Sequence, residues 1–393
     1  MNLAAAKWVD RVAGGVFARA LCGFDAVGRL WSEPPALGDV TGVLIVKFWG
    51  LGNWALLRPV VRDLGARWPS ARTTLVTLEA NRALAGDLAD EVIYLRPKGY
   101  GALAADLFRA VRRIRAVRPT LSVDFEQFSS AGTLLARVGG VPQRLGFASA
   151  FRARDALLNV RVPFRGDVHA SRSFRDLAEA AGVAPGPYVA GALDATEEGC
   201  AEVDALLGRE VGPFVVLHPG SGDNFPGRRW SEAGFSALGR FASERRGLRT
   251  IVTGSTSEAD LCARVARSAG EGAVSVAGRL SVSGLVALIA RAVAIASNDT
   301  GPVHLGSALG RPVLALFGPN TPVLYGPLSE GSRALHKALP CSPCLTADNY
   351  RSSRCRLHVC MASISVGEAS SAFASVIDAG LARSPSHAVA VTP

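Results

Sequence analysis

The sequence predicts an α/β protein with two doubly wound domains that face a cleft. The chain has 393 residues and a hydrophobic content of 49%, which is enough to bury more than one core. From Thr41 onward, short apolar runs alternate with stretches of helical periodicity, a pattern typical of parallel sheets covered on both faces. This rhythm weakens between Pro163 and Pro187, where glycine and proline accumulate, so we expect the chain to cross between domains there.

Each domain is expected to supply its own strands, with helices in the gaps. The expected strands of the N-terminal domain lie at residues 43–47, 73–78, 92–95 and 121–124. Those of the C-terminal domain lie at residues 214–217, 250–253, 274–277, 293–296 and 313–317. The predicted division is an amphipathic helix extension at 1–37, domains at 38–180 and 181–335, and a cysteine-containing segment with a helix at 336–393.

The charge of the chain points to an anionic partner. Its formal net charge is +10, which favours nucleic acid, a phosphorylated glycolipid or an anionic membrane face. Aromatic residues make up only 7% of the chain and are not interleaved with the arginines, so the nucleic-acid interpretation has little support. We therefore expect no nucleic acid among the partners.

Two stretches are candidates for contact with a membrane surface. No apolar run is long enough to span a bilayer and the start lacks a signal peptide, which predicts a cytoplasmic protein. Trp8, Phe17 and Leu21 recur at helical spacing in the extension, which either lies on a membrane or packs on the protein itself. Arginines 109, 112, 113, 115 and 118 form a basic helix that either attracts the inner leaflet and lipid-linked phosphates or is simply solvated. The expected location is peripheral, at the inner membrane.

The most informative segment is residues 298–304, NDTGPVH. It follows an apolar run that reads as a buried strand, and Pro302 suits the first turn of a helix that Asp299 or Thr300 would cap. The start of a helix presents unpaired N–H groups and a positive dipole end, which bind anions such as diphosphates. In open α/β sheets this edge is also where ligands collect. The segment therefore predicts an anion site that includes Asp299, Thr300, Gly301 and His304.

Two further loops are expected at the same edge of the C-terminal domain. Residues 218–222, HPGSG, bring Gly220 and Ser221 to the end of a strand and lead to Arg228. A guanidinium group offers a fixed donor geometry for paired phosphate oxygens. The next strand ends at Gly254, and Glu258 just beyond it could accept ribose hydroxyls or simply begin a helix.

A glycine loop in the N-terminal domain supports a rival interpretation. Gly50 and Gly52 follow a strand and open a helix, and Glu79 ends the next strand at about the distance of a ribose-binding acid. This pattern is that of a dinucleotide-binding oxidoreductase. A short glycine pattern is weakly specific, because any tight turn that brings backbone close to a ligand favours glycine.

Together these loops resemble the heptosyltransferases of glycosyltransferase family nine. The resemblance runs from Val43 to about Val366, and the segments that carry it are residues 218–222, 228–230 (RRW), Gly254 with Glu258, 298–304, 316–319 (LFGP) and 325–327 (YGP). It implies two Rossmann-like domains in the GT-B arrangement, with the acceptor site in the first and the nucleotide-sugar site in the second.

The resemblance also implies an activity. Members of this family transfer a sugar, often heptose from an ADP-sugar, with inversion and without a catalytic metal ion. In this chain, Asp299, Thr300 and Gly301 would then lie at the sugar and diphosphate. Arg228 would replace a lysine that contacts phosphate, and Glu258 would contact the ribose. The implied acceptor is a lipopolysaccharide core or another lipid-linked saccharide.

The chain departs from the family pattern at the expected catalytic base. In the family, the loop after the first strand carries Gly-Asp, whereas this chain has Gly52 and Asn53, and an amide cannot accept the proton. Glu126, beyond the fourth strand, is our candidate base, with Asp124 second; both could instead hold loops. A protein that binds a nucleotide sugar without turnover remains the alternative.

Four cysteines gather in the C-terminal segment. Cys341 and Cys344 have the spacing of a metal-binding pair, and Cys355 and Cys360 follow at a wider spacing. A structural zinc or iron–sulfur site and free thiols in a packed loop are both open, whereas disulfides are disfavoured in a cytosolic chain. No cofactor is expected to be required for catalysis.

Overall fold

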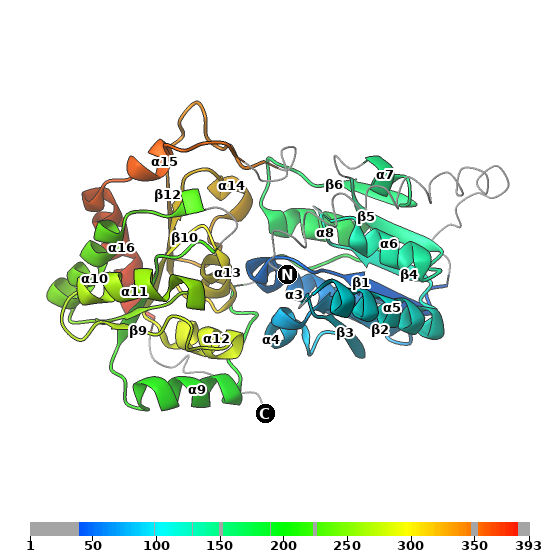
Figure 1. Cartoon of the computed structure of the whole chain (residues 1–393), viewed down its shortest axis with the longest axis horizontal. Helices are drawn as coiled ribbons and strands as arrows, with labels where there is room; N and C mark the ends of the chain where they lie inside the picture. Colours follow the sequence, from blue (N-terminus) through cyan, green and yellow to red (C-terminus); the bar gives the residue numbers. More distant parts are fainter. Residues whose placement is uncertain are drawn as a thin grey trace. The chain divides into compact units, whose positions relative to one another are not determined.

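The computed structural model divides the chain into two compact units, Met1–Tyr188 and Val189–Pro393 (Figure 1). It describes residues 39–97, 99–127, 129–148, 152–188, 190–222, 226–346 and 353–383. The predicted helix at 1–37 lies outside these residues. Each unit is an α/β domain with its own parallel sheet, as predicted.

The first unit holds a six-stranded sheet in the order β3-β2-β1-β4-β5-β6. All neighbouring strands are parallel. The strands are β1 (Gly42–Val46), β2 (Arg72–Leu78), β3 (Glu91–Leu95), β4 (Leu121–Asp124), β5 (Gln143–Ala148) and β6 (Val160–Pro163). Strand order reverses between β1 and β4, which makes the carboxyl ends of these two strands the expected ligand position in this unit.

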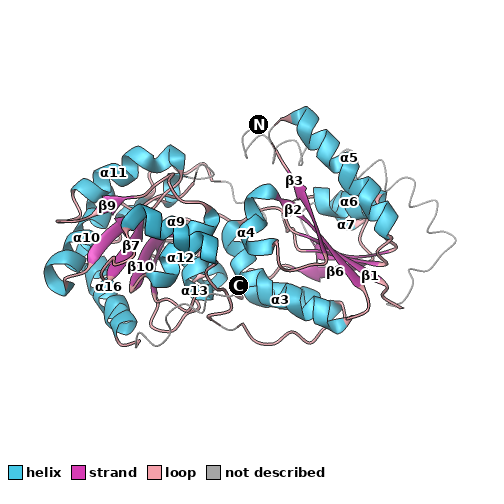
Figure 2. Cartoon of the chain, turned by 90° about the horizontal axis from the view of Figure 1, so that it is seen from below, coloured by secondary structure: helices cyan, strands magenta, loops and turns pink. Residues whose placement is uncertain are grey.

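Helices cover both faces of this sheet (Figure 2). They are α3 (Leu51–Arg67), α4 (Arg82–Ala85), α5 (Tyr100–Val117), α6 (Ala131–Val138), α7 (Arg152–Asp155) and α8 (Ala170–Ala180), with a 3-10 turn, η2 (Glu79–Asn81). Leu44 and Val46 of β1 share a buried cluster with Ala110 and Ile114 of α5, so α5 and α6 cover one face. Helices α3 and α8 contact each other on the opposite face. Burial on both faces explains why these strands read as continuous apolar runs.

The second unit repeats the same plan. Its sheet has the order β12-β11-β10-β7-β8-β9, again all parallel. The strands are β7 (Phe214–His218), β8 (Arg249–Val252), β9 (Val274–Ser275), β10 (Ala294–Asn298), β11 (Val313–Phe317) and β12 (Arg333–His336). The order reverses between β7 and β10, so the carboxyl ends of these two strands mark the ligand position.

The helices of the second unit include two from the C-terminal segment. They are α9 (Glu197–Leu207), α10 (Glu232–Arg246), α11 (Ala259–Arg267), α12 (Val282–Arg291), α13 (Gly301–Ala308), α14 (Pro322–Tyr325), α15 (Val359–Ala362) and α16 (Val366–Leu381), with η3 (Pro226–Arg228) and η4 (Thr256–Glu258). Helices α10, α11 and α16 bury side chains in one cluster against the sheet. Helix α10 begins at Ser231, whose hydroxyl accepts from the Gly234 N–H, and ends at Gly247 in the left-handed conformation.

Some elements differ from the sequence-based expectation. The stretch 163–187, expected as a crossing between domains, contains helix α8, whose Phe174 packs edge-on against Phe125 with ring centroids 6.0 Å apart. The units divide after Tyr188, compared with 180 in the expected division. Strands β5, β6 and β12 had no counterpart in the expected set.

Among the described residues, none of the helices has both the length and the apolar character needed to cross a membrane.

Candidate functional site

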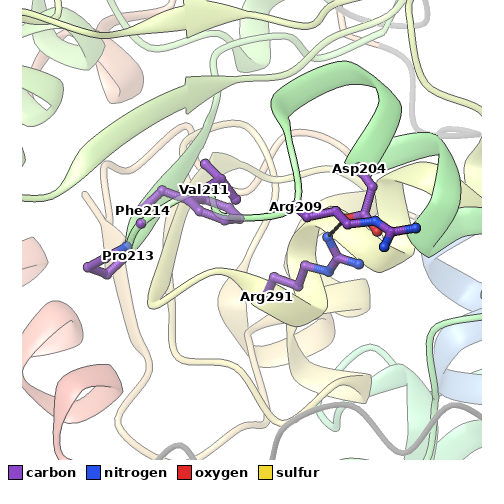
Figure 3. A pocket seen from close by; sticks show the side chains of 7 residues that line it. Asp204, Arg209, Val211, Pro213, Phe214 and Arg291 are labelled. Atoms are coloured by element: carbon purple, nitrogen blue, oxygen red, sulfur yellow. Dashed lines mark hydrogen bonds and ion pairs between the residues drawn. The ribbon is translucent and has the colours of Figure 1, made fainter.

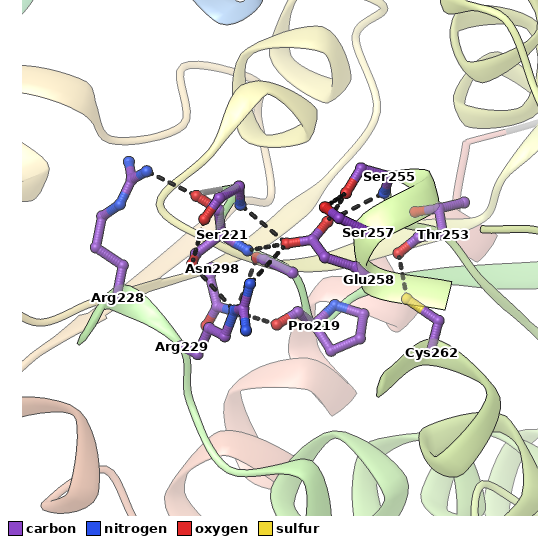
Figure 4. Close-up of polar contacts among 12 residues, drawn as sticks. Pro219, Ser221, Arg228, Arg229, Thr253, Ser255, Ser257, Glu258, Cys262 and Asn298 are labelled. Carbon is purple, nitrogen blue, oxygen red and sulfur yellow. Dashed lines mark hydrogen bonds and ion pairs between the residues drawn. The ribbon is translucent and has the colours of Figure 1, made fainter. Parts of the chain in front are cut away.

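Asn298 ties together the loops at the carboxyl edge of the second sheet. It ends β10 and is fully buried. Its side-chain amide donates to the carbonyl oxygens of Pro219 and Gly220 at 2.8 and 3.1 Å, and its carbonyl oxygen accepts the N–H of Trp230 at 3.0 Å (Figure 4). One buried side chain therefore fixes the glycine loop after β7 and the start of the segment before α10.

Arg228 joins the same glycine loop to Asp299. One of its terminal nitrogens donates to the backbone oxygen of Asp299 at 2.9 Å, and the other donates to the backbone oxygen of Ser221 at 2.7 Å. The first of these nitrogens also lies 3.8 Å from the carboxylate of Asp299. The predicted convergence of Arg228, Ser221 and Asp299 is therefore present, and it places a guanidinium group, with a side chain 14% exposed, beside the start of α13.

Asn320 also belongs to the candidate site, although the sequence patterns did not predict it. It follows β11, is fully buried, and donates from its side-chain amide to the Asp299 carboxylate at 2.8 Å. Its own carbonyl oxygen has no hydrogen-bond partner among the described residues. The feature of the sequence that could have indicated Asn320 is its position three residues after the end of β11, an apolar strand that neighbours β10.

The start of α13 lies directly after Asp299. Thr300 occupies the N-cap position, but its side chain makes no capping hydrogen bond. Its hydroxyl instead donates to the backbone oxygen of Asn298 at 3.2 Å and lies 3.1 Å from the Ser297 hydroxyl. Of the two residues expected to cap the helix, Asp299 or Thr300, it is Thr300 that stands at the cap position, without a capping hydrogen bond from its side chain.

Gly301 and His304 belong to α13 itself. Gly301 is its first residue, and Pro302 lies in its first turn, as predicted. His304 is 5% exposed, and its ring packs edge-on against Tyr325 with centroids 6.0 Å apart. His304 is therefore a buried residue of α13 in contact with α14, and its part in anion binding stays a prediction.

Glu258 holds the glycine loop of β7 against the loop after β8. One carboxylate oxygen accepts the N–H groups of Ser221 and Gly222, both at 2.9 Å, and a terminal nitrogen of Arg229 at 3.2 Å. The other accepts the N–H and hydroxyl of Ser255 at 3.0 and 2.9 Å. Glu258 thus binds the protein's own loops, and contact with a ribose stays a prediction.

The ionisation of this loop pair is strongly perturbed. Burial would raise the pKa of Glu258, but hydrogen bonds from Ser255 and Gly222 and the charge of His218 outweigh it and lower that pKa to about 2. Burial lowers the pKa of His218 to about 4 against the opposing charge of Glu258. His218 also has a ring nitrogen 3.0 Å from the Thr253 hydroxyl. At neutral pH the carboxylate is therefore ionised and the imidazole is neutral.

Two of the predicted glycines permit this close approach. A β-carbon on Gly220 would lie 2.4 to 2.5 Å from the carboxylate atoms of Glu258. A β-carbon on Gly254 would lie 2.5 Å from the sulfur of Cys262. A side chain at Gly220 would push the two loops apart, and one at Gly254 would push its loop away from α11.

The carboxyl edge of the first sheet carries a buried ion pair. Lys47 and Glu126 are each 1% exposed, and the lysine nitrogen lies 3.1 Å from one oxygen of Glu126. The same oxygen accepts the N–H groups of Phe48 and Trp49 at 2.6 and 2.9 Å. The candidate base is thus close to the loop that follows β1, and one of its oxygens already accepts from three donors.

Asp124 organises the neighbouring segment. It is 1% exposed, accepts the Thr133 hydroxyl at 2.6 Å and the Glu126 N–H at 3.0 Å, and lies 3.3 Å from the fully buried Arg154. Burial raises its pKa, and the charge of Arg154 opposes that rise. These contacts make a structural role the simplest account of this residue.

Asn53 lies in the first turn of α3, after Gly50, which adopts a φ of 92°. This conformation favours glycine. Glu79, the candidate ribose acid of the rival interpretation, is the first residue after β2 and pairs with Arg82 at 2.8 Å. The strand–glycine–helix geometry predicted for this loop is therefore present.

The four C-terminal cysteines do not form a ligand set in this structure. Within residues 353–383 and the other described ranges, no group of three or more His, Cys, Asp or Glu side chains is arranged to hold a metal ion. Cys341 and Cys355 are exposed, Cys344 is half-buried and Cys360 is buried. Residues 347–352, which connect the two pairs, lie outside the described part of the chain.

A pocket of about 480 Å³ lies at the opposite end of β7 (Figure 3). Its walls include the ion pair between Arg291 and Asp204, whose atoms are 2.5 Å apart. None of the candidate donor-site residues lines it. The pocket is therefore separate from the edge at which the loops converge.

Comparisons with known proteins agree on a family. The sequence model of glycosyltransferase family 9 (heptosyltransferase) matches residues 108–353. The lipopolysaccharide heptosyltransferase 1 of Pseudomonas aeruginosa is 35% identical over 134 residues, which cover 34% of this chain and 36% of that protein. The lipopolysaccharide heptosyltransferase 2 of Escherichia coli is 25% identical over 312 residues, covering 75% of this chain and 87% of that protein.

A solved structure gives the same fold. The structure of the E. coli ADP-heptose lipopolysaccharide heptosyltransferase II superposes with a TM-score of 0.69 at 20% identity, covering 86% of this chain and 99% of that one. The match to the Pseudomonas protein, by contrast, spans only about a third of its length, 36%.

Proposed function

Because the chain belongs to glycosyltransferase family 9, we propose that it transfers a heptose from an ADP-sugar to a lipopolysaccharide core or other lipid-linked saccharide. The proposed transfer proceeds with inversion at the anomeric carbon and without a metal ion in the catalytic step. The second unit would hold the donor and the first unit the acceptor.

The observation that carries this proposal is the convergence of Arg228, Asp299 and the start of α13 at the carboxyl edge of the second sheet. A departing diphosphate needs positive charge, which Arg228 and the N-terminal dipole of α13 would supply. Asp299, oriented by Asn320, would accept hydrogen bonds from sugar hydroxyls. These groups suit a donor diphosphate without requiring a metal at that position.

Glu126 is the proposed base. To take the acceptor proton at that oxygen, it would have to exchange one of the donors there, since the oxygen now accepts from Lys47 and from the N–H groups of Phe48 and Trp49. We expect Glu126→Gln to abolish transfer while donor binding, assigned to the other unit, persists. Retained transfer by this variant would eliminate Glu126 as the base.

The direct test of the proposed function is a transfer assay. Purified protein is incubated with ADP-heptose and a lipopolysaccharide core acceptor that lacks heptose, and ADP release and acceptor mass are followed. We expect stoichiometric ADP and heptosylated acceptor, and a loss of at least 100-fold in Asp299→Ala, about 3 kcal/mol of lost stabilisation. Absence of transfer with ADP-heptose and with a panel of other nucleotide sugars would overturn the proposal.

A nucleotide-sugar-binding protein without turnover is the second candidate, because the family aspartate is replaced by Asn53. Donor binding with no transfer to any acceptor would favour it. Family membership leaves the oxidoreductase interpretation, based on Gly50, Gly52 and Glu79, without support.

We also propose a structural zinc or iron–sulfur site at the C-terminal cysteines. The spacing of Cys341 and Cys344, with Cys355 and Cys360 further along the chain, supports this proposal. The four sulfur atoms would have to come together from the arrangement described above to hold the metal. Metal analysis of protein purified without chelators tests this. We expect a molar equivalent of zinc, or iron with sulfide, that is lost on replacing Cys341 and Cys344 by serine; metal-free wild-type protein would contradict it.

A lipid-linked acceptor would require the protein to work at a membrane. We therefore propose a cytoplasmic protein that associates peripherally with the inner membrane, in keeping with the net charge of +10.

A further inference from the structure

Exposed apolar side chains in the first unit concentrate around one helix. Its large hydrophobic residues that are more than about a third exposed, among those described, are Tyr100, Phe108 and Val138, at 63, 64 and 38%. Tyr100 and Phe108 belong to α5, and the backbone oxygen of Val138 accepts two hydrogen bonds from Arg115 of α5 at 3.1 and 3.0 Å. All three therefore lie on or beside the outer surface of α5.

The same surface carries positive charge without exposed negative charge from the helix. Asp106 is the single acidic residue of α5, and it is 2% exposed. Arg109 pairs with Asp106 and Arg113 pairs with Glu91 of β3. Arg112 and Arg115 contact no carboxylate among the described residues, and the Arg112 guanidinium lies 5.9 Å from the centre of the Phe108 ring.

Phe108, Arg112 and Arg115 follow the spacing i, i+4, i+7 and so share one face of the helix. We define the α5 face as Tyr100, Phe108, Arg112, Arg115 and Val138. The Phe108 ring is 64% exposed and lies beside two other exposed apolar side chains, and apolar side chains that gather on a surface mark an interaction site more often than single ones do. Aromatic rings flanked by arginines instead match the boundary of a bilayer, where rings enter the acyl region and guanidinium groups remain at the phosphates.

We propose that the α5 face docks on a bilayer surface that contains anionic phospholipid. Charge complementarity selects this occupant, because neither arginine pairs with a carboxylate within the described part of the chain, and anionic headgroups present phosphate oxygens. Arg115 donates to the Val138 backbone oxygen, which leaves its positive charge without a counter-charge. The proposal deepens the proposed function by naming the surface that would hold the protein near a lipid-linked acceptor, and docking itself requires no nucleotide sugar.

The test is co-sedimentation of the full chain with vesicles, without donor or acceptor. The vesicles are phosphatidylglycerol with phosphatidylethanolamine, compared with phosphatidylcholine alone. We expect binding to the anionic vesicles that weakens in high salt. Each basic residue near such a surface contributes about 1 kcal/mol, so Arg112→Glu should weaken binding roughly 5- to 30-fold. Phe108→Ser should weaken it several-fold on the same vesicles.

Arg245→Glu is the matched control. Arg245 is exposed on α10 of the second unit, and its replacement changes the net charge by the same amount. We expect less than a 2-fold effect. Equal losses in Arg112→Glu and Arg245→Glu, unchanged binding in both α5-face variants, or no binding of the wild type would each overturn the proposal. Transfer measured with a detergent-dispersed acceptor should stay at the wild-type level in Phe108→Ser, so a failed transfer assay and a failed docking assay remain distinguishable.

Discussion

Asn298 ends β10 and Asn320 follows the neighbouring parallel strand β11. Both are fully buried, with side chains that bind segments distant in sequence. Asn298 could be assigned to the site from the sequence because it belongs to a segment with a strand, a helix start and an acid in succession. Asn320 could not, because its contact with Asp299 depends on the pairing of β10 with β11, which single-sequence patterns do not specify.

The contact between Asn320 and Asp299 yields the first prediction. Asn320→Ala should lower the efficiency with which donor is used by about 10- to 100-fold, since a hydrogen bond to a charged group is worth about 1.5–3 kcal/mol. Asn320→Asp should place two carboxylates side by side, which raises the pKa of one of them. As the pH is lowered, activity should therefore begin to fall at a higher pH in this variant than in the wild type. The measurement is kcat/KM for the donor between pH 5 and 9. Wild-type efficiency and an unchanged pH profile in both variants would rule out the orienting role.

Gly220 yields a second prediction with its control in the same unit. A methyl group there would meet the Glu258 carboxylate, whereas one on Gly212 would meet nothing within 4 Å. Gly220→Ala should reduce stability by about 1–3 kcal/mol and weaken ADP binding, because the loops must separate. Gly212→Ala should leave both nearly unchanged. Denaturant unfolding measures the stability, and calorimetry measures ADP binding. Equal stability and equal ADP affinity in the two variants would contradict the role of Gly220 in the contact between the loops.

At the scale of elements, the apolar runs predicted nine strands close to their observed bounds, because strands covered on both faces read as continuous hydrophobic segments. Strand β6 was not found, and its residues alternate between half-buried and exposed. Helix α8 was obscured by the glycines and prolines on either side of it, although its Phe174 is fully buried. The local composition predicts loops in these two regions, whereas tertiary packing forms a strand and a helix there.

The loop pair of β7 and β8 predicts a dependence of stability on pH. The unfolded His218 takes a proton near pH 6.5, whereas the folded residue stays neutral until about pH 4. Its contribution is therefore fully present above pH 6.5 and is lost as the pH falls toward 4, by up to about 3 kcal/mol at 1.4 kcal/mol for each pH unit. His336, whose pKa is also lowered by burial, acts in the same direction.

Comparison with His218→Asn isolates this contribution. The free energy of unfolding, measured by denaturant titration between pH 7.5 and 4.5, should fall less steeply in the variant than in the wild type. Parallel pH dependence in the two proteins would show that His218 is not buried in its neutral form.

At the scale of the whole molecule, both units use one strand order and place polar loops at the point where that order reverses. The sequence indicated this duplication through two series of strands followed by glycine loops. It did not indicate that Glu258 binds the loops of its own unit or that Glu126 lies against Lys47, because such contacts arise only when the loops fold together. Roles that depend on a loop's position were therefore more reliable from the sequence than roles assigned to a single carboxylate.

The central claim is that the carboxyl edge between β7 and β10 binds the donor nucleotide. Calorimetric titration of ADP into wild type, Asp299→Ala, Arg228→Ala and Gly212→Ala tests it directly and requires no acceptor. We predict binding by the wild type and Gly212→Ala, with affinity at least 10-fold weaker in the other two, equivalent to about 1.4 kcal/mol. No ADP binding by the wild type, or equal affinity in all four proteins, would contradict donor binding at this edge of the sheet.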